Sequence, residues 1–250
     1  GTTYSSIFQF DEKKNAPIGL TGSCSSYFYP TVISYSKGSW YFGEQALKKN
    51  QCILDLKRMF GILEDSPLLN EVKKIWAIDN ITLRKSEDKG LIEIALKSDP
   101  KSSKIDEWVT PDEIAAKFIR YLFNDNNIPI SRQQKVVVTC PADFNTIQRK
   151  VLMNAMETAG FSSSSVFLLH EPSAASISYM QDSSSDCHYN NFLVCDFGGG
   201  TLDLSLLDIS PKSFTIKNLT GNRYLGGRDF DNAIFEWSKK TFERNLSRKL

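Results

Sequence analysis

The feature that most constrains this chain is a glycine-rich turn between two apolar stretches, VCDFGGGTLD at residues 194–203. Glycine has no Cβ, so it adopts positive φ angles and lets backbone N–H groups approach an oxyanion closely. Three consecutive glycines are more than a hairpin needs to reverse the chain. Gly198, Gly199 and Gly200, with the hydroxyl of Thr201, therefore predict a phosphate-binding turn. The alternative is a plain hairpin whose glycines only turn the chain.

Two carboxylates flank this turn, Asp196 before the glycines and Asp203 after them. Carboxylates repel phosphate, so their presence at a phosphate site makes chemical sense only with a cation between the two. Oxygen ligands and retained water are typical of Mg²⁺ sites. We therefore expect Asp196 and Asp203 to hold Mg²⁺, mainly through water.

Two further segments have the same character. The start of the chain, GTTYS from Gly1, repeats the Gly-Thr pattern of Gly200 and Thr201, which suggests a duplicated lobe closing on one ligand. A third glycine turn, Gly226 and Gly227, precedes the last helical stretch, where amide donors and the helix dipole suit an anion. The chain contains neither GxxxxGK[ST] nor GxGxxG, which excludes a Walker A loop and a Rossmann fingerprint.

Strand-like and helical stretches alternate along the chain, with hairpins between them, which predicts an α/β fold with a partly antiparallel sheet. Thr110 is an expected N-cap, followed by proline at the first helical position. Asn145 opens a capping-box pattern whose helix ends at Gly160. The apolar run at residues 135–140 predicts a buried central strand. Residues 228–245 predict a closing helix.

Composition narrows the class of protein. The chain has 250 residues and a net charge of +1, so there is no electrostatic case for nucleic acid or an anionic membrane. No apolar run is long enough to span a bilayer, and the first residues show no secretory signal. The five cysteines are scattered and form no CxxC pair, which favours reduced thiols in the cytoplasm. The alternative compartment is the endoplasmic reticulum, weakly favoured by three Asn-x-Ser/Thr triplets.

Six blocks together resemble the 70-kDa heat-shock chaperone family in order and spacing: GTTYS, DLKRMFG, VVVTCPADFNTIQR, LLHEPSAASISY, CDFGGGTLDLSLLDI and YLGGRDFDN. The resemblance covers essentially the whole chain and is to the family's nucleotide-binding (ATPase) domain, divergent and incomplete at both ends. It implies the actin-like ATPase superfold, with ribonuclease-H-like lobes, mixed sheets and glycine-rich phosphate hairpins.

The resemblance also implies a domain organisation. Residues 1–184 would form the first lobe, with a core subdomain from 1–34 and 110–184 and an outer subdomain inserted at 35–109. Residues 185–225 would begin the core of a truncated second lobe, and 226–250 its outer subdomain. The strand before the first phosphate loop, the adenosine-binding segment, the linker and the peptide-binding domain would lie outside this chain.

The site residues implied by the resemblance begin with the two phosphate loops. The first loop is matched by Thr2, Thr3 and Tyr4 next to Gly1, and the second by the segment from Gly198 to Thr201. Taken without the resemblance, these residues would be ordinary turn positions.

The expected catalytic residues are Lys57, Glu171, Asp196 and Thr201. Lys57 matches the lysine that contacts the γ-phosphate and the attacking water. Glu171 and Asp196 match the acids around Mg²⁺ and that water, while Thr201 and Asp203 match positions near the metal and a bound K⁺. By itself, Lys57 would be a solvated surface lysine, and Glu171 an acid favoured in a first helical turn.

Two residues match the family's allosteric pair, Pro141 and Arg149, which reports nucleotide state toward the interdomain linker. The chain also departs from the family pattern. His170 stands where Asn is usual, Asp143 where an aromatic is usual, and Arg228 where an acid is usual. The change at Arg228 bears on nucleotide or exchange-factor contacts. His170 is expected to be a neutral structural histidine, and the alternative is a catalytic one.

The leading functional hypothesis is an ATP-binding and ATP-hydrolysing chaperone module that uses ATP/ADP, Mg²⁺ and K⁺. It would couple nucleotide state to peptide binding in a domain not present here. The implied partners are a J-domain co-chaperone, a nucleotide-exchange factor and unfolded peptide, with no nucleic acid and no membrane. One alternative is a nucleotide-binding co-chaperone with little or no hydrolysis, for example of the ribosome-associated type. Another is a sugar kinase or actin-like filament protein of the same superfold.

Overall fold

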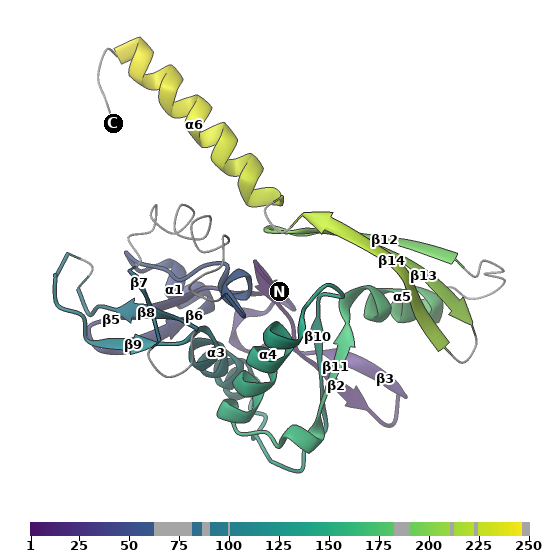
Figure 1. Ribbon diagram of the computed structural model, residues 1–250. Helices are drawn as coiled ribbons and strands as arrows, with labels where there is room; N and C mark the ends of the chain where they lie inside the picture. Colours follow the sequence, from purple (N-terminus) through teal and green to yellow (C-terminus); the bar gives the residue numbers. More distant parts are fainter. Residues whose placement is uncertain are drawn as a thin grey trace. The chain divides into compact units, whose positions relative to one another are not determined.

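The computed structural model describes residues 1–62, 82–86, 91–99, 101–182, 191–210, 213–222 and 225–246. These residues form helices and several small sheets, in agreement with the expected mixed α/β composition (Figure 1). The chain divides into two compact units. Unit 1 contains Gly1–Val138 and Phe144–Leu168, and unit 2 contains Thr139–Asp143 and Leu169–Leu250.

The described part of unit 1 contains short strands and helices. Its strands are β1 (Tyr4–Ser5), β2 (Phe8–Asp11), β3 (Ala16–Gly19), β4 (Tyr29–Pro30), β5 (Ile33–Ser36), β6 (Ser39–Phe42), β7 (Leu83–Lys85), β8 (Ile92–Leu96) and β9 (Glu107–Val109). Its α-helices are α1 (Gly43–Leu47), α3 (Pro111–Asp125) and α4 (Thr146–Ala159), and its 3-10 helices are η1 (Gly22–Cys24), η2 (Leu56–Met59) and η3 (Ser163–Ser165). The strands pair antiparallel as β1-β4, β2-β3, β5-β6 and β7-β8-β9.

Helix α3 confirms its predicted start. Thr110 and Glu113 form a capping box, and Pro111 occupies the first turn, where its missing N–H costs nothing. The Thr110 N–H donates to Glu113 Oε2 at 3.0 Å. Ile114 and Phe118 are buried on one face of the helix, which is the amphipathic pattern that the spacing predicts.

Helix α4 is also capped as predicted. The Gln148 N–H donates to Asn145 Oδ1 at 2.9 Å, and the Asn145 N–H donates to Gln148 Oε1 at 3.0 Å. The helix ends at Gly160, whose φ of 121° is strained for a residue with a Cβ. Helix α4 packs against α3, and Arg120 of α3 donates from Nε to the Ala159 carbonyl at 3.0 Å.

The strand predicted as buried and central differs from the prediction. Strand β10 (Val136–Cys140) pairs with β11 (Val166–His170), and these two make up their whole sheet within the described residues. Burial alternates along β10: Cys140 is fully buried, whereas Val137 is 62% exposed. A short apolar run shows that a strand is favoured, but its period does not say whether one face or both faces are covered.

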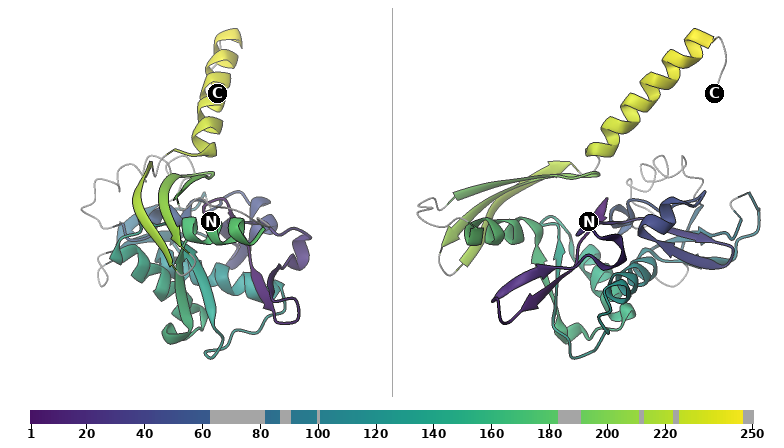
Figure 2. Two further views of the ribbon diagram at one scale, coloured as in Figure 1. Left: turned by 90° about the vertical axis from the view of Figure 1, so that its right-hand side faces the viewer. Right: turned by 180° about the vertical axis from the view of Figure 1, so that it is seen from behind.

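The described part of unit 2 is a three-stranded sheet with a helix against it. Strands β12 (Asn191–Phe197), β13 (Leu202–Ser210) and β14 (Ser213–Asn222) form an antiparallel meander, preceded by α5 (Glu171–Asp182) and followed by α6 (Gly227–Leu246). Figure 2 shows the three strands side by side with α5 alongside. Tyr179 of α5 meets Phe192 of β12 edge to face, with the ring centroids 5.8 Å apart.

The domain division implied by the family resemblance stays a prediction. The predicted boundary between the two lobes, between residues 184 and 185, lies outside the described residues. The described helices include none that is long and apolar enough to cross a membrane.

The core of unit 1 allows a matched test of burial. Ile114 on α3 is fully buried, whereas Ile147 on α4 is 41% exposed. We expect Ile114→Ala to lower the free energy of unfolding by about 2–5 kcal/mol, the range for removing a buried branched side chain. Ile147→Ala makes the same chemical change at an exposed helical position and should cost much less. Urea denaturation measures both, and equal losses would show that the buried face of α3 is misassigned.

Candidate functional site

Unit 2 contains a pocket of about 340 Å³ that gathers several residues singled out from the sequence. Three predicted metal-site acids, Glu171, Asp196 and Asp203, line this pocket together with Pro141. The pocket is built from the segment that follows β10, the start of α5, and strands β12 to β14. A fourth carboxylate, Asp143, also lines it. In the sequence, Asp143 is only a departure from the aromatic residue that the family resemblance implies, and no local pattern marks it as part of a site.

The register of the sheet explains why two of these acids meet. Asp196 of β12 and Asp203 of β13 lie directly opposite each other, on either side of the glycine turn. Directly opposed residues of an antiparallel pair have Cβ atoms about 5 Å apart, and like charges in this position are destabilising. A cation or ordered water between the two carboxylates would relieve that repulsion. Their oxygen atoms are the donors that Mg²⁺ prefers, so this donor set fits the metal.

The remaining acid lies at a helix start. Glu171 is the first residue of α5, where the helix dipole stabilises a negative charge. Within the described ranges, no three His, Cys, Asp or Glu side chains converge closely enough to hold a metal ion directly. The contact expected between the three acids and Mg²⁺ is mainly through water, and it stays a prediction.

The glycine turn between β12 and β13 is closed by its own backbone. The Gly198 N–H donates to the Thr201 carbonyl at 2.9 Å. The third glycine turn lies against it, because the Gly227 N–H donates to the Gly198 carbonyl at 3.0 Å. In the same way, the Arg228 N–H donates to the Gly199 carbonyl at 2.9 Å. The second and third glycine turns therefore form one backbone-packed unit.

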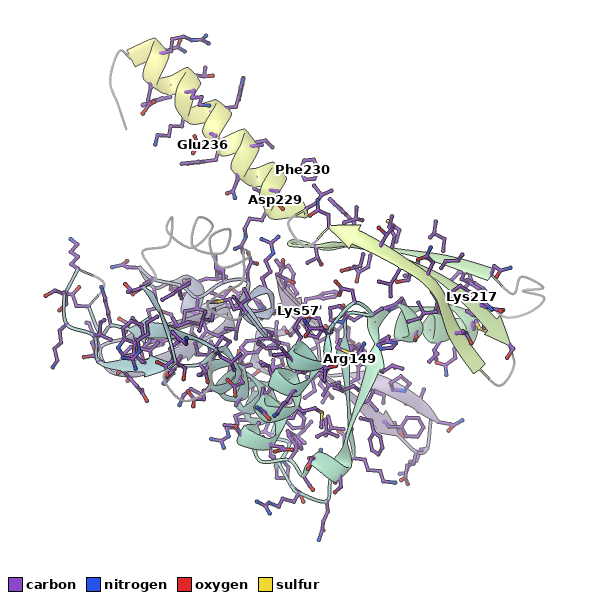
Figure 3. The ribbon with its side chains drawn as sticks, viewed as in Figure 1. Lys57, Arg149, Lys217, Asp229, Phe230 and Glu236 are labelled. Carbon is purple, nitrogen blue, oxygen red and sulfur yellow. The ribbon has the colours of Figure 1, made fainter. Side chains whose placement is uncertain are left out.

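This packing changes the role expected of Gly226 and Gly227. The sequence predicts that their amides face an anion, but the Gly226 N–H donates to Asp229 Oδ2 at 2.7 Å and the Gly227 N–H to the Gly198 carbonyl. A backbone donor that already has an acceptor inside the protein offers little to a phosphate. Direct phosphate contact by these two glycines is therefore a prediction that the hydrogen bonding does not support. Figure 3 shows Asp229 at the start of α6.

Lys57 belongs to unit 1 and is half-buried on η2. Its Nζ lies 6.0 Å from the centroid of the Phe144 ring, within the range of a cation–π contact. The residue before η2, Asp55, is buried with φ at 53° and forms an ion pair with Arg58 at 3.5 Å. Lys57 is thus held by a structured turn, unlike the solvated surface lysine that its local sequence alone suggests.

The predicted allosteric residues occupy different units. Arg149, on α4 of unit 1, donates from Nε to the Phe144 carbonyl at 2.8 Å (Figure 3). Pro141 is buried and belongs to unit 2. Their pairing stays a prediction. Phe144, which contacts both Lys57 and Arg149, was missed from the sequence, although its position directly before the Asn145 cap is a local signal.

The first phosphate segment, Gly1 to Tyr4, also lies in unit 1. A Cβ at Gly1 would collide with the Tyr4 carbonyl, so the tight approach there requires glycine. Thr2 and Thr3 are half-buried, whereas Gly1 and Tyr4 are exposed. Tyr4 enters strand β1, which pairs with β4.

The two carboxylates that flank the glycine turn line the pocket, whereas residues 198–201 of the turn itself are not among its lining residues. Backbone N–H groups of glycine-rich turns bind phosphate oxygens, and neighbouring carboxylates suit Mg²⁺, so the arrangement is compatible with a nucleotide-binding module. Comparison with known proteins identifies the family of this chain: the protein-family model described as "Hsp70 protein" matches residues 1–249. The chain therefore belongs to the Hsp70 protein family, whose members are ATPases of the actin-like fold that bind ATP or ADP with Mg²⁺.

The relatives agree with this assignment. A heat shock protein of Pyricularia oryzae is 30% identical over 100% of this chain and 40% of its own length. A ribosome-associated molecular chaperone of Saccharomyces cerevisiae is 27% identical over 98% of this chain and 38% of its own length. A dnaK-type chaperone protein of Prochlorococcus marinus (strain MED4) is 32% identical over 97% of this chain and 35% of its own length. The chain thus spans well under half the length of these relatives.

Adjacent glycines allow a test of the packed turns. A Cβ at Gly226 would collide with the backbone of Gly199 and Gly200, whereas a Cβ at Gly227 would have its nearest neighbour, Gly199 Cα, at 3.7 Å. We expect Gly226→Ala to destabilise unit 2 by about 1–3 kcal/mol, the usual cost of overpacking. Gly227→Ala should be neutral or slightly stabilising, because alanine favours helix. Amide hydrogen exchange at residues 198, 227 and 228 measures the effect. Unchanged protection in Gly226→Ala would contradict the packing.

Proposed function

We propose that this chain is the ATP-binding and ATP-hydrolysing module of a 70-kDa heat-shock-type chaperone. The observation that supports it best is the pocket of unit 2, which brings Glu171, Asp196 and Asp203 together beside the glycine turn. A hairpin needing only to reverse direction would not require two opposed carboxylates that repel each other. The family match covers the same residues.

In this proposal the glycine turn binds the phosphates and the acids bind the metal. The amides around Gly199 and Gly200 and the hydroxyl of Thr201 bind phosphate oxygens. Because the fold positions these donors in advance, they need little reorganisation when the phosphate binds. Asp196, Glu171 and Asp203 orient the water shell of Mg²⁺, and the metal, when bound, neutralises phosphate charge. We propose K⁺ as a further ion near Thr201 and Asp203. Lys57 stabilises the charge that develops as the bond to the leaving oxygen breaks, and it orients the attacking water.

The remaining residues are proposed to bind or to signal. The segment from Gly1 to Tyr4 supplies backbone and hydroxyl donors to the phosphates. Pro141 and Arg149 report nucleotide state to the linker. We propose the cytoplasm as the compartment, and a J-domain co-chaperone, a nucleotide-exchange factor and unfolded peptide as the partners of the whole protein.

A second candidate function is a nucleotide-binding co-chaperone with little or no hydrolysis. It is favoured by the relatives whose names describe ribosome-associated chaperones, and by Arg228, which stands where an acid is expected. The presence of Lys57, Glu171 and Asp196 favours hydrolysis instead. A single-turnover ATPase assay of the intact protein, with and without ribosomes, separates the two candidates.

Lys57 gives the sharpest test of hydrolysis. We expect Lys57→Ala to slow single-turnover hydrolysis by about 100-fold or more, the scale of losing one donor to developing charge. The affinity for ADP should change by less than about tenfold, since ADP lacks the γ-phosphate that Lys57 would contact. Lys150→Ala, at an exposed position of α4, is the matched control. Hydrolysis at the wild-type rate in Lys57→Ala would move the co-chaperone candidate ahead.

Asp196 should behave differently from Lys57. Asp196→Asn removes charge from the proposed metal shell, so we expect weaker Mg²⁺-dependent nucleotide binding as well as slower hydrolysis. Asp208→Asn is the control, because Asp208 lies on strand β13, next to β12, and pairs at 3.0 Å with Lys217, which is labelled in Figure 3. Calorimetric titration of ADP with and without Mg²⁺ measures the difference. The same Mg²⁺ dependence in Asp196→Asn and wild type would remove Asp196 from the metal site.

A further inference from the structure

The segment from Gly1 to Tyr4 depends on a neighbouring stretch of unit 1 that the sequence did not single out. Strand β1 pairs with β4, and the Thr31 N–H donates to the Thr3 carbonyl at 2.8 Å. The Tyr4 ring meets the Phe28 ring edge to face, with the centroids 6.3 Å apart. The conformation of the proposed phosphate segment therefore follows the position of residues 28–31.

That stretch is anchored by a buried tyrosine hydroxyl. Tyr29, on β4, is fully buried, and its Oη accepts a hydrogen bond from Asn126 Nδ2 at 2.8 Å. The same Oη donates to Asp125 Oδ2 at 3.3 Å. Asn126 Nδ2 also donates to the Leu122 carbonyl at 2.8 Å, which ties the amide to helix α3. Strand β4 is thus fastened to the end of α3.

The Asp125 carboxylate fastens a second piece of the same loop. The Ser23 N–H donates to Asp125 Oδ2 at 2.8 Å, and Ser23 Oγ donates to Asp125 Oδ1 at 2.5 Å. The preceding residue, Gly22, has φ at 48°, and a Cβ there would collide with both Asp125 Oδ2 and Tyr29 Oη. One carboxylate therefore holds two separated points, Ser23 and Tyr29, of the chain that leads into β4.

The Asp125 carboxylate does not stabilise helix α3, at whose C-terminal end it lies. Asp125 is the last residue of α3, where the partial negative charge of the helix end disfavours a carboxylate, and the last turn contains no basic residue. Three donors, two from Ser23 and one from Tyr29, offset that unfavourable placement. Hydrogen bonds to an ionised carboxylate are among the stronger ones in proteins. The hydrogen bonds of Asp125 therefore stabilise the segment from Ser23 to Tyr29 and not helix α3.

We propose that Asp125 and Tyr29 are positioning residues that order the phosphate segment Gly1–Tyr4 before nucleotide binds. This proposal rests on the proposed function, because ordering of Gly1–Tyr4 affects nucleotide binding only if that segment contacts the nucleotide phosphates. Asp125 acts through Tyr29 and β4, and neither residue contacts the ligand. Ordering the segment in advance lowers the conformational cost of binding, so loss of the anchor should weaken affinity.

The test uses Asp125→Asn and Tyr29→Phe in the intact protein. Asn preserves the shape of the side chain but replaces charge-assisted bonds by weaker neutral ones, and Phe removes only the hydroxyl. We expect each variant to bind ATP and ADP about three- to tenfold more weakly, the scale of ordering one or two extra side chains on binding. Single-turnover hydrolysis at saturating ATP should stay within about twofold of wild type, because the ordering cost falls on binding rather than on the chemical step.

Asp106→Asn is the matched control. Asp106 Oδ2 accepts the Ser98 N–H at 2.5 Å, and hydrogen bonds from the Ser98 hydroxyl and amide hold the pKa of Asp106 below its ordinary value. It is therefore another loop-holding acid with a serine partner, but it follows strand β8 and has no described contact with β1 or β4. The same substitution there should leave nucleotide affinity unchanged. An equal loss of affinity in Asp106→Asn would show a general structural effect and overturn the proposal.

Hydrogen exchange and a double variant complete the test. In the nucleotide-free protein, the Ser23 and Thr31 amides should exchange faster in Tyr29→Phe than in wild type. The losses of affinity in Asp125→Asn and Tyr29→Phe should be less than additive, because both act on one network. If Asp125→Asn does not fold, Ser23→Ala removes one of its donors at an exposed position and should still weaken binding.

Two failures are distinguishable. Wild-type protein that binds no nucleotide contradicts the proposed function, whatever the variants do. Wild-type protein that binds nucleotide while Asp125→Asn, Tyr29→Phe and Ser23→Ala bind it equally well overturns the positioning proposal and leaves the proposed function standing.

Discussion

The opposition of Asp196 and Asp203 across the β12–β13 hairpin is the constraint on which the site of unit 2 depends. Two carboxylates facing each other on neighbouring strands repel, so the hairpin is held by other interactions. The closing Gly198 N–H bond to Thr201 and the packing of Gly226 on Gly199 and Gly200 supply them. The charge arrangement therefore suits a cation, while the backbone that bears it is stabilised without one.

In unit 1, too, the elements that stabilise the fold differ from those with proposed chemical roles. Local capping fixes where α3 and α4 begin, and a buried face joins the two helices. The parts with proposed chemical roles lie on short, irregular pieces: Lys57 on the 3-10 helix η2 and Gly1 to Tyr4 beside a two-residue strand pair. Such pieces have few backbone bonds of their own, and side chains lie against them: the Phe144 ring is 6.0 Å from Lys57 Nζ, and Tyr29, beside β1, bonds to Asp125.

The match to the Hsp70 family covers the glycine turns, the acids and Lys57. It does not by itself explain the departures. Asp143 adds a fourth carboxylate to the pocket, which makes the pocket more acidic; the family resemblance implies an aromatic residue at this position. Arg228 donates its amide to the Gly199 carbonyl, so at this position the backbone, and not the side chain, joins the two glycine turns.

Much of the local structure was determined by sequence alone. Thr110 with Glu113 and Asn145 with Gln148 specify helix starts, because the partners lie three residues apart and need no distant contact. The same holds for the glycine turn at residues 198–200. Only the tertiary structure decided that the amides of Gly226 and Gly227 are engaged within the protein, and that Val137 is exposed on a strand with one described neighbour. It also decided that Asp125 anchors β4 across about a hundred residues of chain. These outcomes depend on which segments meet, and a local pattern of residues carries no information about a partner so distant in sequence.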